Sequence, residues 1–166
     1  MNMRVQLLDT TPFWTGALAE KTQGLAAKHM STVVTDDSFL DKLLLETLEG
    51  VGPTRLDAMI CLGALGDVWL QDPAKLLKKY DLKSVDAQGW MQFTPKPENQ
   101  VEFFEITDAH VAGGANFLQG TWGKEIDGIK NLQAFKVGDF VARQTYDHSD
   151  QWVVARKIWL NSYTAK

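Results

Sequence analysis

The densest group of side chains that could carry chemistry is an acid–histidine cluster between Glu102 and His110. Asp108 and His110 are separated by one residue, so they could supply two ligands to a hard metal ion, with a nearby carboxylate as a third. On a strand, Glu102 and Glu105 would point to opposite faces, which weakens a shared site. One hypothesis is therefore a small metal-dependent hydrolase at Asp108 and His110; the alternative is a solvated strand end.

A polar tip, Asp147-His148-Ser149-Asp150, contains the residue types of a proton relay. It lies between two runs rich in β-branched and aromatic residues, 140–146 and 151–159, which together predict an antiparallel hairpin. Asp and Ser are also the residues that such a turn favours. Because no nucleophile is paired with a base at a suitable spacing, we expect a protein that binds rather than an enzyme.

The predicted hairpin carries Trp152 and Trp159, two of the six tryptophans, together with Arg156. Their odd separation would place the two rings on opposite faces of one strand, and an outward Trp beside Arg is typical of a protein contact. In the alternative, both rings are covered. The leading hypothesis is a non-catalytic protein, without a cofactor, that occupies a surface of a host or partner protein as an inhibitor or adaptor, alone or as a homodimer. Its contact residues would be Trp152, Arg156, Trp159, Asp147, His148 and Asp150.

The segment from Leu48 to Ala58 resembles a helix-hairpin-helix, in which a Gly-x-Gly turn between two helices directs backbone N–H groups at a DNA phosphate. The resemblance implies a nucleic-acid-binding module as an alternative function. Its phosphate contacts would be Gly50, Gly52, Arg55, Lys75, Lys78 and Lys79. Leu56 departs from the motif, because a small residue normally stands there. A glycine-capped helix followed by a proline-started helix explains the same residues without a ligand.

Charge and composition narrow these hypotheses. The net charge is −4, with 9 basic and 12 acidic residues up to Trp90 and 8 and 9 after it, so nucleic-acid binding would need a local basic patch. The single cysteine, Cys61, cannot form an intramolecular disulfide and fits a reducing compartment. No apolar run approaches the ~20 residues that cross a bilayer. We therefore expect a soluble cytoplasmic protein without membrane contact, located in the host cytoplasm if it is viral.

The elements that must position these residues change in type near residue 90. Before it, apolar periodicity and capping residues predict about four helices, over residues 15–30, 36–50, 53–63 and 72–80. After it, strands are predicted over 91–94, 101–106 and 132–137, followed by a Gly138-Asp139 turn and the hairpin. The predicted fold class is α+β. A helical part, residues 1–90, packs on an antiparallel β part, residues 91–166, as two domains or one, and we find no internal repeat.

The region from about Pro95 to Tyr163, less than half of the chain, resembles the small phage and prophage proteins named for a Pro-Gly-Asp-Tyr-Gly turn. The first matching feature is a Lys-Pro pair before a Val-Glu strand, here Lys96-Pro97 with Val101-Glu102. The second is a Gly-Asp-aromatic-aliphatic step, here Gly138 to Val141, and the third is an aromatic residue before a final tyrosine, here Trp159 with Tyr163. Val137, Phe140 and Val141 depart from the expected proline, tyrosine and glycine. The resemblance implies a viral or mobile-element origin and no known chemistry.

Overall fold

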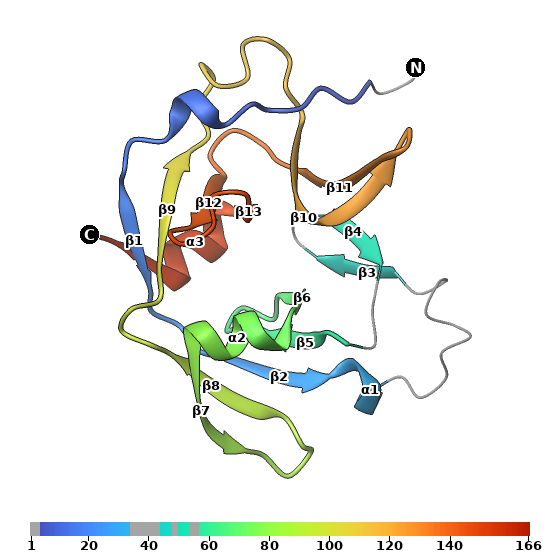
Figure 1. Ribbon diagram of the computed structural model, residues 1–166, viewed down its shortest axis with the longest axis vertical. Coiled ribbons are helices and arrows are strands. Elements are labelled where there is room, and N and C mark those ends of the chain that lie inside the picture. Colours follow the sequence, from blue (N-terminus) through green and yellow to red (C-terminus); the bar gives the residue numbers. More distant parts are fainter. Residues whose placement is uncertain (1–3, 34–43, 48–49, 54–56) are drawn as a thin grey trace.

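The computed structural model describes residues 4–33, 44–47, 50–53 and 57–166, and most of its regular structure is β (Figure 1). The strands are β1 (Leu18–Lys21), β2 (Leu25–His29), β3 (Leu44–Thr47), β4 (Gly50–Pro53), β5 (Met59–Leu62), β6 (Val68–Gln71), β7 (Tyr80–Val85), β8 (Met91–Pro95), β9 (Gln100–Glu105), β10 (Phe117–Ile126), β11 (Ile129–Ala134), β12 (Phe140–Gln144), β13 (Gln151–Val154) and β14 (Tyr163–Ala165). The helical elements within these described ranges are the 3-10 turn η1 (Thr11–Phe13), α1 (Met30–Val33), α2 (Pro73–Lys79) and α3 (Arg156–Ser162).

The predicted α+β fold with a helical N-terminal part is therefore wrong. Strands β1 and β2 occupy the first predicted helix, β3 lies in the second and β5 in the third. The physical reason is visible in the burial of β2 and β5, where alternate residues are buried: Leu25 and Ala27 on one strand, Met59 and Cys61 on the other. Burial with a period of two residues outweighs the helix propensity of leucine, alanine and methionine.

The fourth predicted helix is confirmed as α2. The Asp72 carboxylate accepts a hydrogen bond from the Ala74 N–H at 2.9 Å, and Pro73 occupies the first turn, where its missing N–H is no loss. The helix ends at Lys79, and Tyr80 continues as extended chain into β7. The cap therefore fixes where α2 begins, and with it the positions of Lys78 and Lys79 in the last turn.

Two five-stranded antiparallel sheets, with strand orders β6-β5-β2-β8-β7 and β13-β12-β9-β1-β14, make up the molecule. If β1 to β7 are taken as the counterparts of β8 to β14, the two orders are the same, except that β1 and β8 have changed places. Each half also has a two-stranded hairpin, β3–β4 or β10–β11, and the two hairpins lie side by side (Figure 1). The chain is thus a structural repeat with exchanged first strands, contrary to the expectation of no internal repeat.

The registers of the two halves agree in detail. Trp69 lies opposite Cys61 in the first sheet, as Trp152 lies opposite Ala142 in the second. A helix of seven residues follows each tryptophan strand and leads into a tyrosine that pairs with the exchanged strand. The Met30 N–H donates to the Ala58 carbonyl at 3.0 Å, and the Ile106 N–H donates to the Asp139 carbonyl at 2.8 Å, at the matching positions. The repeat therefore extends to individual backbone hydrogen bonds.

The C-terminal hairpin is confirmed in its first part and corrected in its second. Strands β12 and β13 pair antiparallel, as predicted, but β13 ends at Val154 and α3 begins at Arg156. Trp159 is consequently on a helix, 5% exposed, and stacks at 10° between planes on Phe140 and Tyr163, with centroid distances of 4.7 and 4.3 Å. The predicted opposite-face arrangement of Trp152 and Trp159 fails because they do not share a strand.

Within the described ranges, no helix has the length and apolarity that crossing a bilayer requires.

We predict that Trp159→Ala lowers the free energy of unfolding by about 3–5 kcal/mol, because it removes a buried aromatic ring between two stacked neighbours. Guanidinium unfolding followed by far-UV circular dichroism measures this loss. The adjacent Leu160 is 64% exposed, so Leu160→Ala is the matched control, with a change within ~0.5 kcal/mol. Equal stability of the two variants would show that Trp159 is not in the core.

Candidate functional site

A pocket of about 330 Å³ lies between the two halves. The first half contributes β1, β6 and α2, and the second half contributes β10, β12, β13 and α3. Its walls are rich in aromatic rings, namely Trp69, Tyr80, Trp122, Trp152 and Tyr163. Since Trp69 and Trp152 hold equivalent positions in the repeat, each half presents the same type of ring to the pocket.

Three lysines line the same pocket, Lys21 on β1 and Lys75 and Lys79 on α2. The Lys79 ammonium lies 4.8 Å from the ring centroid of Trp152, and that of Lys21 lies 4.7 Å from the ring of Tyr163. Such positions over ring faces favour a cation through the quadrupole of the ring. The lysines therefore lie inside the aromatic lining.

Lys79 is the most buried of these amines, at 9% exposure. The pKa of Lys79 is lowered from 10.5 to about 7, mainly by burial and further by the positive charges of Lys21 and Lys75, while the negative charge of Asp150 partly opposes the shift. Among the described residues, no carboxylate lies within salt-bridge distance of Lys79. At neutral pH the pocket thus contains an amine that exchanges between charged and neutral forms.

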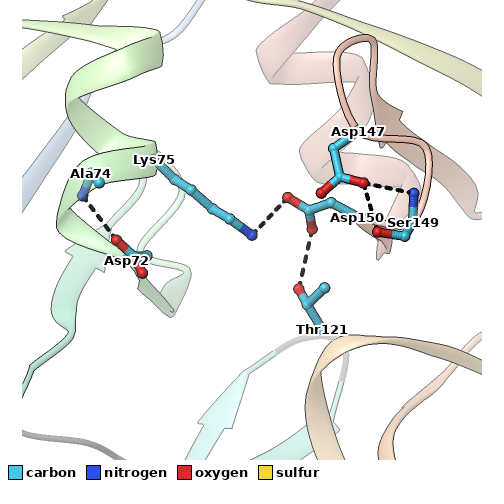
Figure 2. A network of polar contacts seen from close by, with 7 residues as sticks. All are labelled: Asp72, Ala74, Lys75, Thr121, Asp147, Ser149 and Asp150. Carbon is cyan, nitrogen blue, oxygen red and sulfur yellow. Dashed lines mark hydrogen bonds and ion pairs between the residues drawn. The ribbon is translucent and has the colours of Figure 1, made fainter.

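Lys75 is held by a carboxylate from the other half (Figure 2). Its Nζ lies 2.8 Å from Oδ2 of Asp150, and the Thr121 hydroxyl donates to Oδ1 of Asp150 at 3.1 Å. This ion pair joins α2 to the loop before β13. Because Asp150 is 4% exposed, its carboxylate is largely shielded from solvent. In the same loop, hydrogen bonds from the side chain and backbone of Ser149 lower the pKa of the exposed Asp147. Asp147 therefore shapes the loop, whereas Asp150 faces the pocket.

Gln144 brings an unsatisfied acceptor to the pocket. Its side chain is 2% exposed, and its Oε1 atom has no hydrogen-bond partner within the described part of the chain. Leaving such a buried acceptor unpaired costs about 1–3 kcal/mol. Gln133, also in the lining, is by contrast satisfied, because it donates to the Trp122 carbonyl at 2.7 Å and accepts from the Val153 N–H at 2.8 Å. Of these two glutamines in the lining, Gln144 is therefore the one with an unpaired buried acceptor.

The six residues predicted to contact a partner protein fall in different places. Trp152 and Asp150 line the pocket, and Trp159 belongs to the core, so it is not available on the surface. His148 is exposed with its Nε2 3.7 Å from Oε1 of Glu102, while Arg156 binds the Glu105 carboxylate at the surface. Of the predicted contact residues, Asp147, His148 and Arg156 are exposed, and their contact with a partner protein stays a prediction.

The residues predicted to bind phosphate that the structure describes lie on two elements, β4 and α2, and their contact with phosphate stays a prediction. Gly50 and Gly52 lie on β4, which pairs with β3, so this segment is extended rather than a turn between two helices. Arg55 lies outside the described residues. Lys75 and Lys79 line the pocket, and the Lys78 ammonium lies 4.0 Å from the ring centroid of Tyr146.

The predicted metal ligands Asp108 and His110 lie in the turns after β9. His110 Nδ1 accepts a hydrogen bond from the Thr107 N–H at 3.0 Å, and its ring packs 4.3 Å from that of Phe13. In the residues that the structure describes, no three His, Cys, Asp or Glu side chains are grouped as metal ligands would be. Cys61 is buried, and burial raises the pKa of its thiol to about 12, so it is a poor nucleophile at neutral pH.

Comparison of the chain with protein families, with curated proteins and with solved structures gives no match.

The sequence interpretation missed the pocket as a site, and with it Trp69, Lys21 and Gln144. One signal was present in the sequence: Trp69 precedes Tyr80 by eleven positions, and Trp152 precedes Tyr163 by the same number. This spacing corresponds to the repeated strand, seven-residue helix and tyrosine. It would have predicted two equivalent elements, although not that they face each other.

We predict that Lys79→Met changes how stability depends on pH. The folded pKa of Lys79, about 7, lies below the value of ~10.4 in an unfolded chain, so the unfolded state binds more protons between these values. Wild-type stability should therefore rise by about 3 kcal/mol between pH 6 and pH 9 relative to the variant, since about two pH units of that range lie above the folded pKa. Guanidinium unfolding at pH 6, 7.5 and 9 measures the difference.

Lys78→Met is the matched control, because Lys78 is the exposed neighbour of Lys79 on α2. It should keep the pH dependence of the wild type. A Lys79→Met protein with that same dependence would contradict the lowered pKa of Lys79.

Proposed function

We propose that the protein is a non-catalytic binding protein whose ligand is a small planar organic anion, held in the pocket between the two halves. The observation that carries this proposal is a buried lysine without a carboxylate partner among the described residues, inside an aromatic-lined pocket of about 330 Å³. Pockets of ~300–1,000 Å³ with apolar walls and a few converging polar groups are typical small-molecule sites.

The aromatic walls support a planar ligand. Trp69 enters the lining from the first half and Trp152 from the second, and Tyr163 adds a further ring. Flat ligands gain contact area and favourable quadrupole interactions against such rings, whereas saturated rings of the same size gain less. A planar ligand would therefore contact both halves at once.

The lysines support a negative charge on the ligand. Besides burial, which is the largest cause of its lowered pKa, Lys79 experiences repulsion from Lys21 and Lys75 and attraction from Asp150. A ligand carboxylate or phosphate would be attracted by the positive charges of Lys21 and Lys75.

This proposal keeps the expected class of non-catalytic binding protein but moves the contact from an exposed hairpin to the pocket. Trp152 and Asp150 have a role in both hypotheses, whereas Trp159 supports the pocket from the core through its stacking on Tyr163.

We predict that 2-naphthoate binds to the protein, that the uncharged 2-naphthalenemethanol binds more weakly, and that Trp152→Ala weakens 2-naphthoate binding about tenfold. The loss of one aromatic contact, about 1–1.5 kcal/mol, gives this factor. Isothermal titration calorimetry at pH 7 measures all three. Circular dichroism of the variant verifies that it is folded.

Trp90→Ala is the control for the loss of a tryptophan, because Trp90 packs under Lys28 and is not part of the pocket lining. Its affinity for 2-naphthoate should equal that of the wild type. Equal affinities for the acid and the alcohol, or an unchanged affinity of folded Trp152→Ala, would contradict the proposed function.

A further inference from the structure

We propose that Lys79 binds its ligand covalently, by forming an imine between its Nζ atom and the carbonyl carbon of an aromatic aldehyde that also carries an acidic group. The inference rests on the proposed function, because the pocket must first admit a planar anion. It goes further, because it gives the buried amine a chemical role and adds a carbonyl to the ligand.

The geometry distinguishes Lys79 from the other pocket amines. Lys75 is bound at 2.8 Å to the Asp150 carboxylate, and its side chain is 38% exposed. Lys79 is 9% exposed and has no carboxylate at salt-bridge distance in the described part of the chain. Of these two amines on α2, Lys79 is thus the one whose surroundings favour the neutral form.

A neutral amine is required because the nitrogen lone pair is the nucleophile. Two effects favour that form here, burial in the pocket and the nearby positive charges of Lys21 and Lys75; with the opposing charge of Asp150 included, the pKa of Lys79 is lowered to about 7. Desolvation together with a neighbouring cation is a known way to activate a lysine for imine formation.

The reaction is a condensation without net oxidation or reduction. The Lys79 lone pair attacks the carbonyl carbon, a C–N bond forms, and the carbonyl π electrons move to oxygen, which takes up one of the protons that the nitrogen gives up. The resulting carbinolamine loses its hydroxyl and the second nitrogen proton as one water molecule and leaves a C=N bond.

The remaining lysines have a separate role in this arrangement. Lys21 and Lys75 line the pocket on β1 and α2, so they can hold the acidic group while Lys79 reacts with the carbonyl. An aromatic ring between the two groups would lie against the aromatic walls. The chemical class is therefore a planar aldehyde with a carboxylate or phosphate on the same molecule.

The test uses 4-formylbenzoate with sodium cyanoborohydride at pH 7.5. Cyanoborohydride delivers a hydride to the imine carbon and converts the C=N bond into a stable secondary amine. Intact-mass measurement and peptide mapping then locate the adduct. We expect one adduct, on Lys79, forming at least tenfold faster than on Lys78, and slowed by an excess of 4-methylbenzoate, which lacks the aldehyde.

Two variants and one state of the wild type serve as controls. Lys79→Met should lose the single adduct, and Trp152→Ala should slow its formation through weaker binding. Wild-type protein in guanidinium should react at its lysines without preference, since the pocket no longer exists. This last control does not depend on any variant folding.

The outcomes separate the inference from the proposed function. If 4-methylbenzoate binds by calorimetry but native protein is labelled at its lysines without preference, the imine is wrong and the binding pocket stands. If neither binding nor selective labelling is found, both are wrong. A selective adduct on Lys21 or Lys75 instead of Lys79 would also overturn the assignment of the nucleophile.

Discussion

The exchange of β1 and β8 between the two sheets is the constraint on which the rest of the structure depends. Strand β8 lies between β2 and β7 of the first sheet, and β1 lies between β9 and β14 of the second. Without the exchanged strand, each sheet would have a gap with unpaired N–H and C=O groups on both sides of it. Neither half can complete its own sheet, so backbone hydrogen bonds hold the halves together and fix their relative position.

The pocket follows from this exchange and from the differences between the two halves. The exchange places Lys21, from the first half, directly opposite Tyr163 in the second sheet. At equivalent positions of the two seven-residue helices, Lys75 corresponds to Ile158 and Lys79 to Ser162. One helix therefore supplies two amines to the pocket, whereas the other supplies the apolar side chain of Ile158. Because the two halves repeat the same elements, the pocket has similar walls on its two sides. Because the two helices differ at these positions, the two sides of the pocket are chemically different.

Local signals in the sequence predicted those parts of the fold whose cause is local. Helix α2 follows from the Asp72-Pro73 cap, and the hairpin β12–β13 follows from two β-rich runs around a polar tip. The N-terminal strands were misread because leucine and alanine favour helices unless a neighbouring sheet buries alternate residues. The site could not be predicted, because the lowered pKa of Lys79 arises from burial under elements far away in the sequence.

The most direct test of a ligand site between the halves is a nuclear Overhauser measurement on 2-naphthoate bound to the protein with assigned indole protons. The account predicts cross-peaks from the naphthyl ring to Trp69 in the first half and to Trp152 in the second, because both line the pocket. Cross-peaks confined to one half, or to Trp90 outside the pocket, would contradict it.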